Sequence, residues 1–162
     1  MLGTIRPVID LTILGYGALK LRHLVCDVDG TLTVDGRFQE DLFRPLLALR
    51  DRLDLHLLTA DVHRQQDALD FRLGFKAIRL QLGEEACQKK AYVESLGQGV
   101  VVIGQGADDA AMMGVAELGI CVLSPEGVAV ETLLAADLVV PDTARALQLL
   151  MNPMRIVNSL RK

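Results

Sequence analysis

The sequence predicts an α/β domain of three layers, with a central parallel β-sheet between two layers of helices. Two observations carry this prediction. Short apolar runs without polar alternation, which are typical of strands buried on both faces, recur along the chain. Segments with apolar residues at helical spacing separate these runs, so strands and helices alternate from residue 23 onward. Crossovers in such a sheet are right-handed, and its ligands bind beyond the carboxyl ends of the strands.

The opening segment is expected to form a β-hairpin, because apolar strands at 8–14 and 18–21 flank Gly15-Tyr16-Gly17. This Gly-x-Gly precedes a strand rather than a helix, so a phosphate-binding loop is not expected there. The first central strand is expected at 23–28. The run Val34-Asp35-Gly36-Arg37 then predicts a tight turn.

The same alternation continues to the end of the chain, and Gly74 and Gly97 end two of its helical segments. The later strands are expected at 55–58, 77–82, 99–103, 119–122 and 138–140. Helices are expected at 41–53, 63–73, 86–96, 108–117, 127–135, 143–150 and 153–160. No linker, repeat or low-complexity segment interrupts this order. We therefore expect residues 1–162 to form a single domain, with 1–21 as an N-terminal hairpin extension.

Composition narrows the possible partners. Of the 162 residues, 51% are hydrophobic and only 4% aromatic, so the core must be aliphatic. The formal net charge of −4 argues against nucleic acid or an anionic membrane as a partner. No stretch reaches the roughly 18 apolar residues that a membrane span needs. The three cysteines lack metal-ligand spacing and are expected to be reduced, which predicts a cytoplasmic protein.

The most informative stretch is Asp27-Val28-Asp29-Gly30-Thr31-Leu32-Thr33, which directly follows an apolar strand. Residues i and i+2 of an extended strand point to the same side, so Asp27 and Asp29 can serve one site. Gly30 allows a sharp turn, and the Thr31 hydroxyl can bond nearby backbone. One carboxylate as nucleophile beside a second as proton shuttle can transfer a phosphoryl group through an aspartyl-phosphate. An Asp-Gly pair alone would indicate only a turn.

Further polar residues lie near the ends of the other expected strands. Thr59 follows the strand at 55–58, and Lys89 and Lys90 lie in the helix ahead of the valine-rich strand. A glycine-rich turn after that strand carries the adjacent acids Asp108 and Asp109. Mg²⁺ prefers oxygen ligands and keeps several waters, so two or three carboxylates suffice to bind it. A lysine can act as a compact cation on a phosphoryl oxygen.

In order along the chain, residues 27–33, Thr59, Lys89 and residues 104–113 resemble the four motifs of the haloacid dehalogenase (HAD) superfamily of aspartyl-phosphate enzymes. The chain is also similar to the branch described as soluble relatives of the P-type ATPase phosphorylation domain. The resemblance covers nearly the whole chain from Leu21 onward. It implies a Rossmann-like fold and a Mg²⁺-dependent phosphatase that works through an aspartyl-phosphate.

The resemblance also implies a role for individual residues. Asp27 would be the nucleophile and a magnesium ligand. Asp29 would protonate the leaving group and then activate water, while its backbone carbonyl touches the metal. Asp108 and Asp109 would complete the metal site.

The resemblance places the phosphoryl group against a second set of residues. Thr59 and Lys89 would hold its oxygens, in a site that also includes Ala60 and Gly30. Lys89 is preferred to Lys90 for this role, because Lys89-x-x-x-Val93 fits the spacing in the pumps.

The chain departs from the pattern of its relatives at two positions. Gln105 stands where the first acid of the fourth motif, usually the principal magnesium ligand, is expected. A neutral amide is a weaker ligand for a hard cation, so metal binding must depend on Asp108 or Asp109 or be weak. Asp29 replaces the threonine of the ion pumps, and an acid at this position implies rapid hydrolysis of the aspartyl-phosphate.

The spacing of the motifs leaves no room for an inserted cap domain. Roughly 30 residues separate Asp27 from Thr59 and Thr59 from Lys89, which connecting strands and helices fill. A pump's nucleotide-binding domain is excluded in the same way. Phosphoryl transfer benefits from a closed site, so we expect a homo-oligomer in which a neighbouring subunit covers it. The expected substrate is a phosphorylated small molecule or a phosphoprotein.

Two alternatives to a general phosphatase stay open. The first is a catalytically degenerate regulatory or phosphate-binding protein, because Gln105 removes an expected ligand and a fold alone does not prove activity. The second is a sugar-phosphate phosphatase resembling the capless tetrameric sugar-acid phosphatases, whose first motif and following turn are similar. Their fourth motif, however, has acids where this chain has Gln105.

Overall fold

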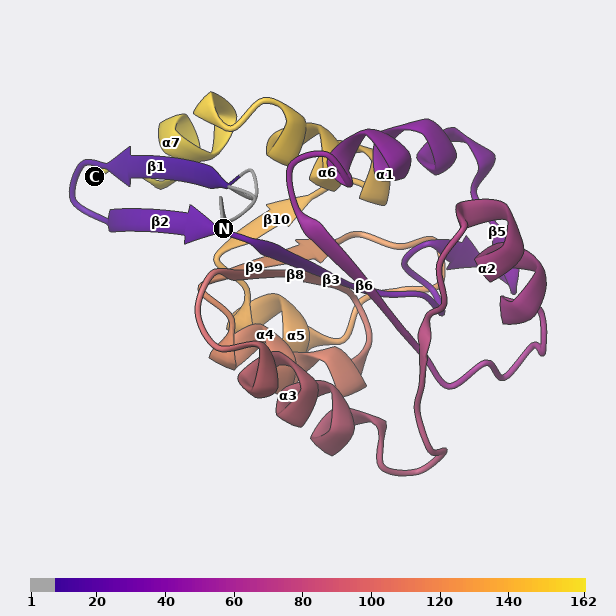
Figure 1. The fold of residues 1–162 in the computed structure, drawn as a ribbon. Coiled ribbons are helices and arrows are strands. Elements are labelled where there is room, and N and C mark those ends of the chain that lie inside the picture. The colour runs from indigo at the N-terminus through magenta and orange to yellow at the C-terminus, as the bar shows by residue number, and fades with distance from the viewer. Residues whose placement is uncertain (1–7) are drawn as a thin grey trace.

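The computed structural model describes residues 8–162, so the first seven residues of the expected N-terminal extension lie outside it. Its centre is a six-stranded sheet in the order β10-β9-β8-β3-β6-β7, and every neighbouring pair is parallel (Figure 1). The six strands are β3 (His23–Asp27), β6 (Asp54–Thr59), β7 (Ile78–Arg79), β8 (Val100–Gly104), β9 (Leu118–Val122) and β10 (Leu138–Val140). The parallel sheet expected from the sequence is confirmed.

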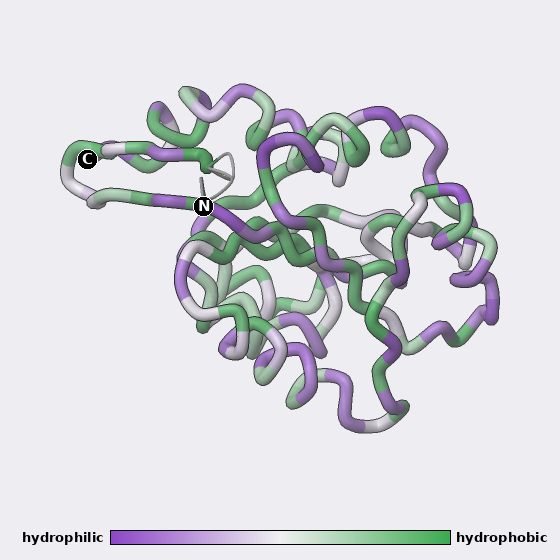
Figure 2. The backbone as a smooth tube through the Cα atoms, in the orientation of Figure 1, coloured by the Kyte–Doolittle hydropathy of each residue, from purple (hydrophilic) through white to green (hydrophobic). Residues whose placement is uncertain are grey.

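Helices cover both faces of this sheet. On one face lie α3 (Glu85–Leu96), α4 (Ala110–Val115) and α5 (Val130–Ala135), and on the other α1 (Phe43–Leu49) and α6 (Thr143–Met151) (Figure 1). The strands contribute to a core on each side. Leu24 and Cys26 of β3 face one core, whereas Val25 between them faces the other. The three-layer prediction is therefore confirmed, and Figure 2 shows the central strands as largely hydrophobic.

The N-terminal hairpin is also present. Strands β1 (Ile9–Ile13) and β2 (Gly17–Leu21) pair antiparallel, and their alternating burial places one side of the hairpin against the core. The hairpin packs beside α7 (Met154–Leu160), and the amide of Lys162 donates a 3.0 Å hydrogen bond to the carbonyl of Leu14 (Figure 1). None of the helices in residues 8–162 is long and apolar enough to cross a membrane.

The tight turn expected at 34–37 is the tip of a small antiparallel hairpin formed by β4 (Thr33–Val34) and β5 (Arg37–Phe38). We call residues 33–38 the flap. The backbone of Gly36 is left-handed, with φ of +75°, and the imidazole of His63 packs against it. A Cβ atom at Gly36 would lie 2.6 Å from the Cγ atom of His63, so only glycine fits here.

Several helices are shorter than their apolar periodicity predicts. The segment expected at 41–53 begins with a 3₁₀ turn, η1 (Glu40–Leu42), and its α-helix α1 ends at Leu49. Helix α2 (Gln66–Leu73) begins three residues later than expected. The carboxylate of Asp61 explains this, because it accepts hydrogen bonds of 3.0 and 3.1 Å from the amides of Gln65 and Gln66. Because the Asp61 carboxylate binds the amides at the start of the helix, the residues between Asp61 and Gln65 form a loop.

Asp70 fixes α2 to the sheet edge, and its replacement by Asn is expected to lower the free energy of unfolding by about 1–3 kcal/mol at pH 7. Its buried carboxylate lies 2.7 Å from the Arg79 guanidinium and accepts hydrogen bonds from the Gln66 side chain and the Ala77 amide. These partners outweigh burial and hold the pKa of Asp70 below the usual aspartate value. Urea unfolding of the wild type and the variant would measure the difference.

The pH dependence of this effect follows from the sign of the shift. Because the pKa of Asp70 is lower in the folded protein, its stabilisation is fully present above the unfolded value of about 3.9. The stabilisation is lost as the pH falls through the folded pKa, so wild type and variant should converge in acid. Asp67→Asn is the matched control, because Asp67 pairs with the same Arg79 but is fully exposed. Equal losses in the two variants would contradict the prediction.

Candidate active site

The candidate site lies at the carboxyl edge of the three central strands. Asp27 is the last residue of β3, Thr59 the last of β6 and Gly104 the last of β8. Because β3 lies between β8 and β6, these three strand ends are neighbours although their residues are far apart in sequence. Buried parallel strands leave only their ends accessible to a ligand, so chemistry concentrates there.

A buried lysine joins three carboxylates at this edge. Lys89, on α3, is only 2% exposed. Its ammonium donates hydrogen bonds of 2.7 Å to Asp27, 2.6 Å to Asp108 and 2.8 Å to Asp109. An ammonium has three donors, so each is matched to one acid. Lys90, the other lysine considered, points to the surface, where its ammonium lies 3.9 Å from Glu94.

These buried charges shift one another's pKa. Burial raises the pKa of Asp27 above the usual range, and the Asp109 carboxylate adds to this while the Lys89 ammonium opposes it. Burial also raises the pKa of Asp109, again against the Lys89 ammonium. Burial works against the charge of Lys89, but the three carboxylates outweigh it and raise the pKa of this lysine. Lys89 therefore remains a cation that the acids share.

Asp29 is held by a different set of bonds. Its carboxylate accepts a 2.8 Å hydrogen bond from the hydroxyl of Thr59, whose oxygen accepts a 2.8 Å bond from the amide of Asp61. Ala60 lies between Thr59 and Asp61 in the sequence and is half-buried. The second oxygen of Asp27 accepts a 3.0 Å bond from the hydroxyl of Thr31. The structure thus connects Asp27 to Lys89, and Asp29 to Thr59.

Gly30 and Gln105 pack directly against each other in the site. The backbone of Gly30 is left-handed, with φ of +82°, and a Cβ atom there would overlap the side-chain amide of Gln105. Gln105 is buried, and its backbone amide donates a 2.9 Å hydrogen bond to Asp109. The glutamine that replaces the expected acid therefore packs over the turn that follows the two aspartates.

Sequence reasoning missed two residues of the loop after β9 that support this turn. The hydroxyl of Ser124 donates a 2.6 Å hydrogen bond to the carbonyl of Gly30. The carboxylate of Glu126 accepts a 3.3 Å bond from the amide of Asp35 in the flap. The signal in the sequence that indicates Ser124 is its position two residues beyond an expected strand.

The carboxylates fit a hard divalent cation. Among residues 8–162, Asp27, Asp108 and Asp109 each offer an oxygen, and these oxygens lie within 4.8 Å of one another. Oxygen donors of this kind suit Mg²⁺. The carboxylate of Asp29 does not belong to this group and instead bonds Thr59. The resemblance described above implies a contact of Asp29 with the metal through its backbone carbonyl, not its carboxylate.

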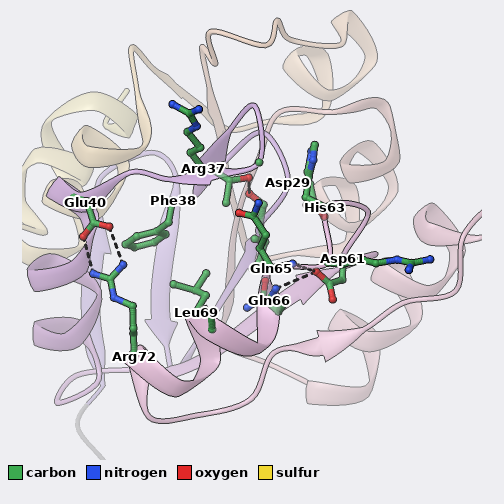
Figure 3. A pocket seen from close by; sticks show the side chains of 15 residues that line it. Asp29, Arg37, Phe38, Glu40, Asp61, His63, Gln65, Gln66, Leu69 and Arg72 are labelled. Atoms are coloured by element: carbon green, nitrogen blue, oxygen red, sulfur yellow. Dashed lines mark hydrogen bonds and ion pairs between the residues drawn. The ribbon is translucent and has the colours of Figure 1, made fainter.

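A cleft of about 580 Å³ opens beside Asp29, between the flap and α2 (Figure 3). Its apolar lining includes Phe38 and Leu69, and its charged lining includes Arg37 and Arg64. Clefts of about 300–1,000 Å³ are typical of small-molecule sites in proteins. The site therefore combines a dense charge cluster at the strand ends with an adjoining space for a ligand.

Solved structures of known proteins share this architecture. One is a protein of Streptomyces avermitilis MA-4680 assigned to the HAD family of hydrolases; it is 19% identical, with a TM-score of 0.63 over 80% of this chain and 83% of that one. Another is 3-deoxy-D-manno-octulosonate 8-phosphate phosphatase from Moraxella catarrhalis, solved with magnesium, phosphate and its sugar acid. It is 18% identical, with a TM-score of 0.67 over 86% and 90% of the two chains. The protein has the Rossmann-like HAD hydrolase fold.

The chain also has a relative in sequence. It is 36% identical over 86 residues to the uncharacterised protein MJ0073 of Methanocaldococcus jannaschii, a match that covers 50% of this chain and 92% of the relative. The chain belongs to the same family as this archaeal protein. No protein-family model matches it.

Proposed function

We propose that the protein is a Mg²⁺-dependent phosphatase that works through an aspartyl-phosphate on Asp27. The observation that carries the proposal is the contact between the Lys89 ammonium and Asp27, made at the carboxyl edge of the sheet beside a second acid, Asp29. A buried carboxylate held by a lysine is oriented for attack, and a nearby acid can move the proton that phosphoryl transfer requires. The HAD fold, which the chain shares with solved hydrolases, supports this choice of chemistry.

The reaction would proceed in two steps. An oxygen of Asp27 attacks the phosphorus atom, and Asp29 gives its proton to the leaving ester oxygen as the P–O bond breaks. Asp29 then takes a proton from water, and the resulting hydroxide attacks the same phosphorus atom. This releases inorganic phosphate and restores the Asp27 carboxylate and the protonated Asp29.

Phosphoryl binding requires an exchange of hydrogen bonds. The Lys89 ammonium and the Thr59 hydroxyl each already donate to a carboxylate. A phosphoryl oxygen would take over one donor from each, and in doing so would release Asp29 for proton transfer. Gly30 and Ala60 would frame the same space with their backbone. Donors aimed at the transferred group stabilise the charge that develops on it.

Mg²⁺ would be held by Asp27, Asp108 and Asp109 together with the backbone carbonyl of Asp29, and when bound it would screen the repulsion between acids and phosphate. Gln105 reduces the number of charged ligands, so we expect weaker metal binding than a site with a fourth acid would show. We also propose that the protein forms a homo-oligomer in which a second subunit covers the open cleft.

The direct test is release of p-nitrophenol from p-nitrophenyl phosphate by protein freed of metal with EDTA. Turnover should appear on addition of Mg²⁺ and disappear again with excess EDTA. A protein with no turnover at high Mg²⁺, and no Mg²⁺ binding by calorimetry, would contradict the proposal. That result would favour the second candidate, a degenerate phosphate-binding or regulatory protein, which the Gln105 side chain over Gly30 supports.

A narrower version of the main proposal is a sugar-phosphate phosphatase. The similarity in fold to the Moraxella catarrhalis enzyme favours testing this class first. A panel of sugar phosphates and sugar-acid phosphates, assayed by phosphate release under the same Mg²⁺ conditions, would separate it from a general phosphatase. A higher kcat/KM for these compounds than for p-nitrophenyl phosphate is the expected result if the narrower proposal is correct.

A further inference from the structure

The acids that line the cleft beside Asp29 are already matched by internal donors. Asp29 accepts the hydroxyl of Thr59, and the Asp61 carboxylate caps α2. Glu40 forms a two-point ion pair with Arg72, with hydrogen bonds of 2.7 and 2.6 Å. Each of these three carboxylates therefore has a donor within the protein, and Glu40 is paired with an opposite charge.

The remaining basic residues of the lining have no such partners. Arg37 and Arg64 are both exposed, and neither makes a hydrogen bond or ion pair through its side chain with any residue that the structure describes. Arg37 comes from the flap and Arg64 from the loop after β6, so they approach the cleft from two separate segments. His63 adds a third basic group, and Figure 3 shows it extending in the same direction as Arg37. The protein, with a net charge of −4, thus places two guanidinium groups without ion-pair partners among residues 8–162 at this cleft.

The backbone of Arg64 has a strained conformation. Its φ is +52°, a left-handed conformation that residues other than glycine rarely adopt, and its amide donates a 3.0 Å bond to the carbonyl of Asp61. Asp61 itself has φ of +51°. Strained backbone conformations of this kind cluster at active sites and ligand sites, and here two lie within four residues. The strain accompanies a loop that brings an arginine to the cleft.

The floor of the cleft is apolar. Phe38 and Leu69 line it side by side (Figure 3), and Val28 also belongs to the lining. A carbon skeleton can lie on such a floor while polar groups at the rim orient it. The volume of about 580 Å³ suits a small molecule and favours this substrate class over a phosphoprotein.

We propose that this cleft binds the leaving group of a small phosphate monoester that carries a second anionic group, and that Arg37 and Arg64 recognise that group. The proposal rests on the proposed function, because it takes Asp29 to protonate the leaving oxygen at the mouth of the cleft. Guanidinium groups bind carboxylate and phosphate through paired hydrogen bonds, so either anion satisfies the geometry. The two arginines are thus specificity-determining residues for a doubly anionic substrate.

The test uses phosphonates that cannot be hydrolysed, titrated into the Mg²⁺-loaded protein by calorimetry. Phenylphosphonate has a neutral tail, whereas 4-carboxyphenylphosphonate and 1,4-phenylenediphosphonate carry a second anion of each kind. We expect at least one anionic ligand to bind about tenfold more tightly than phenylphosphonate, and the better of the two identifies the anion. The double variant Arg37→Gln/Arg64→Gln should lose this preference, whereas Arg155→Gln, an exposed arginine on α7, should keep it.

Equal affinity of the wild type for all three ligands, or no binding of any of them, would overturn the proposal. An undiminished preference in the double variant would also overturn it. Hydrolysis of p-nitrophenyl phosphate, which has no second anion, separates this inference from the proposed function. Turnover without an anionic preference would refute the inference alone, whereas a preference without turnover of any ester would refute the phosphatase and leave the cleft as an anion site.

Discussion

Replacement of Asp27 by Asn is expected to lower kcat for p-nitrophenyl phosphate by about 10³-fold or more, because the amide cannot attack phosphorus. The variant should remain folded. Asp27 is one of three carboxylates around Lys89, so two still face the ammonium after the exchange. Burial also raises the pKa of Asp27, because it disfavours the charged form, so we expect a neutral group of the same shape to be tolerated at this position.

Two measurements separate a chemical from a structural effect. Circular dichroism and thermal unfolding should show a folded Asp27→Asn protein with a Tm close to that of the wild type. Acid quenching during turnover of a ³²P-labelled ester should trap label on the wild type and none on the variant. Asp51→Asn, an exposed acid away from the site, is the matched control and should keep full turnover. A variant of Asp27 that retains turnover would exclude this residue as the nucleophile.

Replacement of Lys89 by Met is expected to have the largest effect on stability, a loss of about 3–5 kcal/mol in the free energy of unfolding. The reason is the charge that remains. Asp27 and Asp109 are almost fully buried, and Lys89 is the cation that contacts both of them and Asp108. Without it, two buried carboxylates and the partly exposed Asp108 face one another with no cation between them. Turnover should be lost as well, because a donor to the phosphoryl group is removed.

A divalent cation should reverse part of this loss. In Lys89→Met the three acids stay together, so Mg²⁺ is expected to raise the Tm of this variant more than that of the wild type. The double variant Lys89→Met/Asp109→Asn should be more stable than Lys89→Met alone, because it removes one of the repelling charges. Lys90→Met serves as the control, since its half-exposed ammonium lies 3.9 Å from Glu94 and should contribute little. Equal stability of Lys89→Met and Lys90→Met would contradict the role assigned to the buried lysine.

Much of the fold and part of the candidate site could be predicted from the sequence. The strands could be recognised because burial on both faces of the sheet requires apolar residues at nearly every position of a strand, as in the valines that begin β8. Asp27, Asp29 and Thr59 could be selected because they lie at or just beyond the ends of such strands. These signals are local, since the identity of a few consecutive residues determines them. Helix ends were less well predicted, because the cap formed by Asp61 outweighs apolar periodicity at the start of α2.

The tertiary structure decided which of these residues meet. The order of β8, β3 and β6 brings Asp109 and Lys89 to Asp27, and the pairing of Asp29 with Thr59 depends on the same order. The hydrogen bond from Ser124 to Gly30 likewise joins distant segments. The cleft also brings together Arg37 and Arg64, which come from separate segments of the chain. The layers, the strand ends and the types of residue at those ends follow from local sequence patterns. Only folding determined their partners, because strand order and side-chain contacts depend on long-range packing that no local pattern encodes.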